Sequence, residues 1–90
     1  MIEPIKAVEQ SILKLDLGCG KNKKEGYTGV DCRDFGQDLT ADLREPWPWP
    51  DGSVDEVHCS HFVEHLNAAE RIHFVNELYR VLIPGGKAQI

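Results

Sequence analysis

Apolar residues of this chain fall in short runs separated by glycine, proline and charged residues, a pattern that predicts short buried strands. The clearest runs are Ile12–Leu17, Tyr27–Asp31 and Val54–Cys59, a weaker one covers Gln37–Ala41, and a fifth strand is expected to open at Lys87–Ile90. We expect each strand to be apolar on both faces, which is typical of parallel sheets covered on both sides.

One helix is predicted over Ala68–Leu82. Asn67, followed three residues later by Glu70, has the spacing of a capping box at its start. Pro84-Gly85-Gly86 is expected to end it. Apolar residues recur at helical spacing and predict one buried stripe, made of Ile72, Val75, Leu78 or Tyr79, and Leu82.

The remaining segments are expected to be short or irregular. Residues 1–10 are interpreted as an N-terminal extension with a short helix from Pro4, and Lys21–Gly26 as a turn. Alternating prolines make residues 44–53 a loop, because proline removes a donor and excludes helix and ladder alike. His61–Leu66 is expected to form one or two helical turns. Strands alternating with loops or helices predict one α/β domain over residues 1–90.

Composition narrows the class of protein. The 90 residues are 41% hydrophobic, contain no run long enough to cross a bilayer, and carry a formal charge of −5. This acidity argues against sequence-independent nucleic-acid binding, which depends on clustered cations. The three cysteines cannot all pair, so we expect a reducing, cytoplasmic setting without a membrane partner.

Acidic residues stand at the ends of the first two predicted strands. The run Leu13–Leu17 contains Asp16 and is followed by Gly18-Cys19-Gly20, and the second run ends at Asp31. Glycines at such a position are expected to leave backbone N–H groups uncovered for a ligand. Two neighbouring strand ends with carboxylates beside a glycine-rich loop predict a nucleoside pocket.

Six strings occur in an order that resembles the class I S-adenosylmethionine-dependent methyltransferases. They are Leu15-Asp16-Leu17-Gly18-Cys19-Gly20, Gly29-Val30-Asp31, Asp42-Leu43, Pro50-Asp51-Gly52-Ser53-Val54-Asp55, Ser60-His61-Phe62-Val63-Glu64-His65-Leu66 and Arg80-Val81-Leu82-Ile83-Pro84-Gly85-Gly86. The resemblance covers residues 12–90 and implies a Rossmann-like parallel sheet, S-adenosylmethionine as cofactor, and methyl transfer to an acceptor.

Two departures from the family pattern are evident. The interval between Gly20 and Asp31 is too short for the usual helix, as in a subgroup of short predicted methyltransferases. The family sheet has seven strands, whereas this sequence reaches about five. We therefore expect an incomplete domain, the cofactor-binding half of an enzyme, with an open sheet edge that invites pairing with another copy.

The resemblance assigns roles along the cofactor. It implies that the loop Gly18-Cys19-Gly20 lies against the methionyl part and that Asp16 meets its ammonium group. Asp31 would accept the ribose hydroxyls, since a carboxylate offers two acceptor oxygens and no donor. Asp42, or Asp38 if the register differs, would meet the adenine amino group, and the Leu43 N–H a ring nitrogen.

The acceptor side is implied after the fourth strand. Ser60 is expected at the methionyl contact, and His61 is the candidate for positioning or deprotonating a methyl acceptor. A histidine bonded to backbone at a helix start is an equally good interpretation of His61. Glu64 and His65 would share a helical face with it, or form a solvated face. The acceptor is expected to be a small molecule or a glycan.

Other interpretations remain open at this point. Gly18-x-Gly20 begins like a dinucleotide-binding fingerprint, but position 23 is Lys23 instead of glycine. Cys59, His61 and His65 could suggest zinc, yet no second ligand pair accompanies them, so no metal site is predicted. A catalytically inactive or self-associating remnant is the alternative from another class.

Two groups of side chains in the loops also have more than one interpretation. Lys21, Lys23 and Lys24 could contact phosphate or form a solvated charge cluster. Trp47 and Trp49 could flank adenine or pack in the core.

Overall fold

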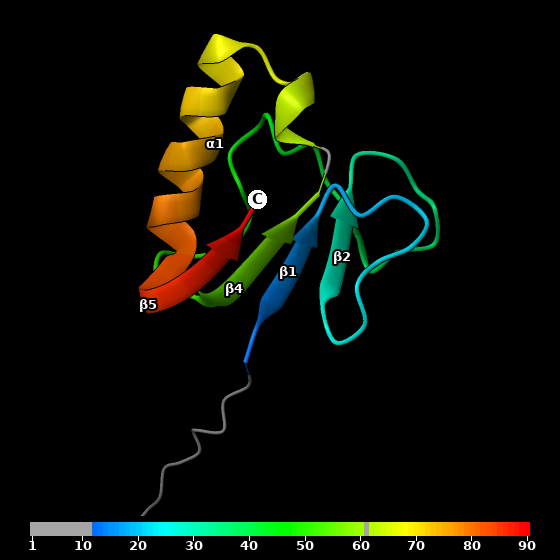
Figure 1. Ribbon diagram of the computed structural model, residues 1–90, viewed down its shortest axis with the longest axis horizontal. Helices are drawn as coiled ribbons and strands as arrows, with labels where there is room; N and C mark the ends of the chain where they lie inside the picture. The colour runs from blue at the N-terminus through cyan, green and yellow to red at the C-terminus, as the bar shows by residue number, and fades with distance from the viewer. Residues whose placement is uncertain (1–11, 61) are drawn as a thin grey trace, which may run out of the picture.

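A five-stranded parallel sheet with a helix on one face makes up the computed structural model, which describes residues 12–60 and 62–90 (Figure 1). A 3-10 turn, η1 (Val63–His65), and the helix α1 (Ala68–Val81) connect the last two strands. The strands, in the spatial order β3-β2-β1-β4-β5, are β1 (Lys14–Leu17), β2 (Thr28–Asp31), β3 (Leu39–Thr40), β4 (Val54–Cys59) and β5 (Leu82–Gln89). The predicted α/β class is confirmed. The helix expected near Pro4 lies outside the described residues.

The strand order reverses beside β1, because the chain runs outward to β3 and then returns to place β4 on the other side of β1. At such a switch point the loops leaving neighbouring strands diverge and open a crevice at the carboxyl ends. The predicted site residues after β1, β2 and β4 therefore meet at one edge of the sheet.

One face of the sheet forms the apolar core. The parallel register sets Leu15 beside Val57 and Leu17 beside Val30, and all four side chains are fully buried. Phe74 of α1 packs into the same cluster. Side chains alternate between faces along a strand, so these positions account for every second residue of β1 and β4.

The opposite face is polar, and the expectation that each strand is apolar on both faces is wrong. Asp16 lies beside His58 and Gly29 in the register, and Lys14 lies beside Glu56. The connection from β1 to β2 forms turns, as expected for Lys21–Gly26, so no crossover helix lies over this face. Of the polar side chains at these positions, Lys14, Glu56 and His58 remain partly exposed, whereas Asp16 is buried.

The start of α1 has the predicted capping box. The Asn67 side chain accepts from the Glu70 N–H (2.8 Å), and the Glu70 carboxylate accepts from the Asn67 N–H (3.0 Å). The end of α1 differs from expectation, because the helix stops at Val81 and β5 begins at Leu82 instead of Lys87. A register shift between Val54 and Glu56 accommodates the extra β5 residues.

The helix stripe that is buried coincides with the predicted one only at Leu78 and Leu82, which are partly buried against the core. Phe74 and Val81 are buried in α1, whereas Ile72, Val75 and Tyr79 are 64%, 46% and 81% exposed. Both sets recur at helical spacing, so periodicity alone could not decide which one meets the sheet.

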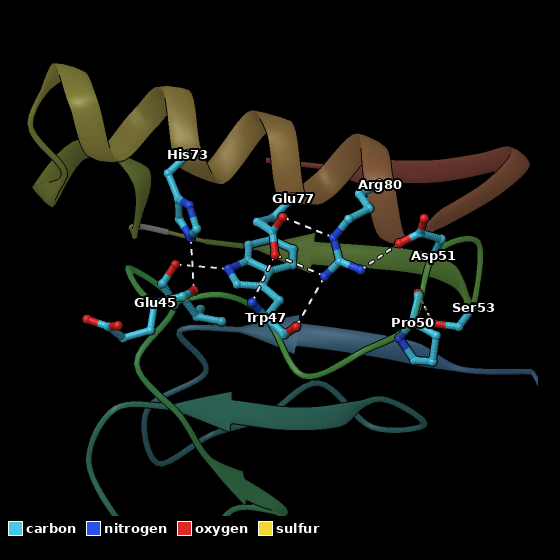
Figure 2. Close-up of polar contacts among 9 residues, drawn as sticks. Glu45, Trp47, Pro50, Asp51, Ser53, His73, Glu77 and Arg80 are labelled. Carbon is cyan, nitrogen blue, oxygen red and sulfur yellow. Dashed lines mark hydrogen bonds and ion pairs between the residues drawn. The ribbon is translucent and has the colours of Figure 1, made fainter.

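The loop between β3 and β4 is fastened to α1 through Trp47 (Figure 2). Glu77 accepts from the Trp47 N–H (2.9 Å), and Arg80 donates to the Trp47 carbonyl (3.1 Å) and to Asp51 (2.8 Å). The Arg80 guanidinium that bonds Glu77 holds the pKa of that carboxyl below its ordinary value. Trp47 packs edge-on against Phe74, which resolves its role in favour of the core.

Trp49 packs against Trp47 with ring centroids 5.8 Å apart, and it is half-buried at the edge of the core. His73 makes a further contact between α1 and the loop, through its Nε2 and the Glu45 carbonyl (2.9 Å; Figure 2). In the described part of the chain, no helix has the length and apolar character that crossing a bilayer requires.

Candidate functional site

Three adjoining cavities line the carboxyl edge of the sheet. The first, of about 210 Å³, lies beyond β2 and β3, and the second, of about 310 Å³, lies beyond β1. The third, of about 370 Å³, lies beyond β4 and β5. Gly18 lines the first and second, and His58 and Ser60 line the second and third. The cavities are therefore neighbours over the strand ends, and we refer to the three together as the trough.

Most of the predicted cofactor residues line this trough. Asp31, Asp42 and Leu43 line the first cavity, together with Gly18. The second cavity is lined by Asp16, Gly18, Cys19, Asn22, Lys24, His58 and Ser60. Gly20 lines none of the three, and His61 lies outside the described residues. Sequence reasoning thus found the acids, and it missed the lining residues Arg44, Phe62, Glu70, Asn22 and His58.

The glycine-rich loop is held by its own amides, and the expectation of uncovered N–H groups is wrong. The N–H groups of Gly18 and Cys19 both donate to the Val30 carbonyl (2.7 and 3.2 Å). The Gly20 N–H donates to Asp31 Oδ2 (2.8 Å). The loop folds back on the end of β2 and continues the ladder, so its donors are used before any ligand arrives.

Gly18 is required at its position for two independent reasons. Its φ is +70°, a conformation that side-chain-bearing residues rarely adopt. A Cβ placed on Gly18 would lie 2.9 Å from the Cβ of Phe62, which is closer than real contacts allow. Because of this close approach, Phe62 lines the first cavity directly beside Gly18.

Asp16 is a buried carboxylate that faces the second cavity. It is 4% exposed, and its Oδ2 accepts from the backbone N–H of Lys24 (2.7 Å). The described residues provide no hydrogen bond to its Oδ1. Burying a charge in this way is costly unless further partners compensate it, which makes Asp16 a natural acceptor for a cationic ligand group.

Asp31 is fixed in orientation at the end of β2. Its Oδ2 accepts from Gly20 and its Oδ1 accepts from the Arg33 N–H at 3.3 Å. Each carboxylate oxygen has a second lone pair, so both can still accept from ligand hydroxyls.

Asp42 and Asp38 have separate roles. Arg44 grips the Asp42 carboxylate through Nε (3.0 Å) and Nη2 (2.9 Å), and lowers the pKa of Asp42 to about 2. Asp38 instead accepts from the Gly29 N–H (2.8 Å) and pairs with Lys23 (3.0 Å), and it lines none of the three cavities. Of these two acids, Asp42 therefore lines the first cavity, where it is paired with Arg44.

Among the residues that the structure describes, the cysteines and histidines do not form a metal-binding group. Cys59 is buried, which raises the pKa of its thiol to about 12, and it lines the third cavity. His65 lines the first cavity. Across residues 12–60 and 62–90, no three potential ligands form a metal-binding group. Burial also raises the pKa of the Cys19 thiol, and all three cysteines are free.

Comparison with known families identifies the class of this chain. A family model described as "Methyltransferase domain" matches residues 21–90. The match covers most of the sequence, and the chain belongs to the methyltransferase-domain family. The matched region includes Asp31 and Asp42 but begins after Asp16 and Gly18.

A solved structure gives the same result for the fold. The crystal structure of a SAM-dependent methyltransferase from Archaeoglobus fulgidus matches with a TM-score of 0.69 and 27% sequence identity. The match covers 83% of this chain, which spans 42% of the solved one. No curated protein sequence matches this chain.

Proposed function

We propose that this chain binds S-adenosylmethionine along the trough and forms the cofactor-binding part of a methyltransferase. The observation that carries the proposal is the distribution of three acids over the first and second cavities. Asp16 lies at the second cavity, and Asp31 and Asp42 lie at the first. In that order the acids match an ammonium group, a ribose and an adenine. Membership of the methyltransferase-domain family supports the same assignment.

The residues of the trough fit this cofactor. Asp16 has an oxygen available for the ammonium group, and Asp31 retains lone pairs for the two ribose hydroxyls. We assign Asp42 and the backbone N–H of buried Leu43 to the adenine end of the cofactor. We assign Ser60 to the boundary between the methyl donor and the methyl acceptor.

In methyl transfer from a sulfonium, the main role of the protein is to position the methyl donor and the acceptor. When bound, S-adenosylmethionine supplies a methyl group on a sulfonium whose departure leaves a neutral thioether, so no general acid is needed. The chain's residues orient the ligand and exclude water, which is catalysis by proximity and orientation. A base is needed only where the acceptor must lose a proton early. We propose His61 for that role or for positioning the acceptor.

The third cavity is our candidate for the methyl-acceptor site. Its lining includes the polar side chains His58, Ser60, Glu64 and Gln89, which suit hydrogen bonding to a small molecule or a glycan. The net charge of −5 disfavours a nucleic-acid acceptor. β5 is an edge strand of the described sheet, and we propose that it also supports association with a second copy. Sedimentation analysis across protein concentrations tests this association.

A dinucleotide cofactor is the competing ligand, and one feature of the chain disfavours it. Residues 18–27 form turns where the dinucleotide fold places a helix whose N-terminus holds a pyrophosphate. Lys23 replaces the third glycine and is tied to the Tyr27 carbonyl (2.8 Å).

Titration calorimetry separates the two ligands. We expect S-adenosylhomocysteine to bind and NAD to give no heat. Asp31→Ala should weaken S-adenosylhomocysteine binding by about 1–3 kcal/mol, because charge-assisted hydrogen bonds are lost. Asp34→Ala is the matched control, since Asp34 is an exposed acid in the next loop that lines none of the cavities. Binding of NAD, or equal affinities of the Asp31 variant and the parent chain, would contradict the proposal.

A further inference from the structure

The second cavity is lined by residues of opposite charge. Asp16, 4% exposed, stands on one wall, and Lys24 and Asn22 stand on the loop that follows β1. The backbone N–H of Lys24 donates to Asp16 (2.7 Å), so this loop is held directly beside the buried carboxylate. A carboxylate and a cationic side chain that line one cavity match the two charges of an α-amino-acid group.

The backbone N–H groups of Gly18, Cys19 and Gly20 do not supply the anion-binding half of this cavity. In many glycine-rich loops free N–H groups cradle a ligand anion. Here the N–H groups of Gly18, Cys19 and Gly20 are all donated to Val30 and Asp31. A carboxylate entering the second cavity therefore needs other donors, and the side chains of Lys24 and Asn22 line this cavity.

The three lysines of the loop have different surroundings. Lys23 bonds the Tyr27 carbonyl (2.8 Å) and Asp38 (3.0 Å), and Lys21 lines none of the cavities. Lys24 lines the second cavity, with its Nζ 5.7 Å from the centroid of the Tyr27 ring. Among the described lining residues of this cavity, Lys24 is the side chain with a permanent positive charge.

The charges along the trough favour Lys24 as the partner of a ligand carboxylate. Asp31, Asp42 and Glu70 line the first cavity, where the cation Arg44 is already paired with Asp42 at 2.9 Å. A ligand carboxylate placed there would meet repulsion from the acids, whereas beside Lys24 it would meet attraction.

We propose that Lys24 and Asn22 form the subsite for the α-carboxylate of the bound ligand, opposite the Asp16 subsite for its ammonium group. The assignment rests on the proposed function, because it deepens the recognition of the methionyl end. The Asn22 amide contributes a neutral donor beside the Lys24 ammonium. His58 forms the adjacent wall, and its buried Nδ1 has no hydrogen-bond partner in the described chain, so this wall has unused polar capacity.

Comparing three thioether ligands isolates the contribution of the ligand's α-carboxylate to the affinity. S-adenosylhomocysteine has the whole amino-acid end, its decarboxylated analogue S-adenosyl-3-thiopropylamine keeps only the amine, and 5′-methylthioadenosine lacks both groups. Affinities are measured by titration calorimetry on the parent chain and on Lys24→Ala, Lys24→Arg, Asn22→Ala and Lys21→Ala. Circular dichroism melting checks that each variant is folded.

We expect Lys24→Ala to weaken S-adenosylhomocysteine about tenfold or more, as the loss of one charge-assisted hydrogen bond predicts. Its affinity for the two ligands without a carboxylate should not change. Asn22→Ala should show the same selectivity with a smaller loss, Lys24→Arg should recover most of the affinity, and Lys21→Ala should match the parent chain.

Two results would overturn the subsite while leaving the proposed function in place. One is unchanged S-adenosylhomocysteine affinity in Lys24→Ala. The other is an equal loss for all three ligands, which would mean that Lys24 supports the fold of the loop. If the parent chain binds neither S-adenosylhomocysteine nor 5′-methylthioadenosine, the proposed function itself fails, and the subsite fails with it.

Discussion

The indole hydrogen bond of Trp47 ties the core to the first cavity, and its removal is the sharpest test of the loop's structure. Trp47 is 5% exposed, and its Nε1 donates to the carbonyl of Leu43, a residue that lines the first cavity. Trp47→Phe deletes this donor and leaves a buried carbonyl without its partner. Trp49→Phe is the matched control, because Trp49 is half-buried and its indole donates no hydrogen bond within the described chain.

The magnitude of this effect follows from the contacts. An orphaned buried acceptor costs about 1–3 kcal/mol, and the smaller ring of phenylalanine loses packing against Phe74 as well. We therefore expect Trp47→Phe to lower the free energy of unfolding by about 2–4 kcal/mol. The control should lose less than about 1.5 kcal/mol, the usual upper range for a substitution that roughly conserves shape.

Urea unfolding followed by circular dichroism measures the difference. The unfolding midpoint of Trp47→Phe should fall with an unchanged slope, since the surface exposed on unfolding stays similar. The affinity for S-adenosylhomocysteine should fall too, because Leu43 is no longer held. A loss in Trp47→Phe within about 0.5 kcal/mol of the control would refute the claim that this bond fastens the loop.

Two further predictions concern Gly18 in the loop after β1 and Asp42 at the first cavity. Gly18→Ala should destabilise more than Gly36→Ala in thermal melts, because both positions have positive φ but only Gly18 also meets Phe62; equal losses would contradict that contact. The Asp42 carboxyl, monitored by NMR, should titrate near pH 2, and in Arg44→Gln its pKa should return toward 3.8. Because the folded pKa is depressed, the Asp42–Arg44 pair contributes stability above about pH 4 that is lost as the pH falls toward 2. If Asp42 still titrates near pH 2 in Arg44→Gln, Arg44 is not the cause of the low pKa.

Local signals in the sequence were sufficient for much of the fold. The bounds of β4 were predicted as Val54–Cys59 and are confirmed, and the capping box of Asn67 and Glu70 is confirmed atom by atom. Asp31 ends β2 as expected. Each of these features depends on residues a few positions apart, so the spacing itself carries the information.

The site was predictable in part for the same reason. Acids at strand ends are visible in the sequence, and parallel pairing brings those ends together, so Asp16 and Asp31 both reach the trough. Arg44, two residues after Asp42, was not singled out, although an arginine so close to a candidate acid was a usable signal.

The sequence by itself determined the bounds of β4, the end of β2 and the start of α1, because those choices depend on neighbouring residues along the chain. Only the tertiary structure decided which stripe of α1 is buried, because Phe74 and Ile72 both belong to apolar sets at helical spacing and only packing on the sheet distinguishes them. It also decided that the loop amides bond the Val30 carbonyl, a partner on another strand whose distance no local pattern encodes. The N–H groups of Gly18, Cys19 and Gly20 are therefore used within the fold, through tertiary hydrogen bonds to Val30 and Asp31.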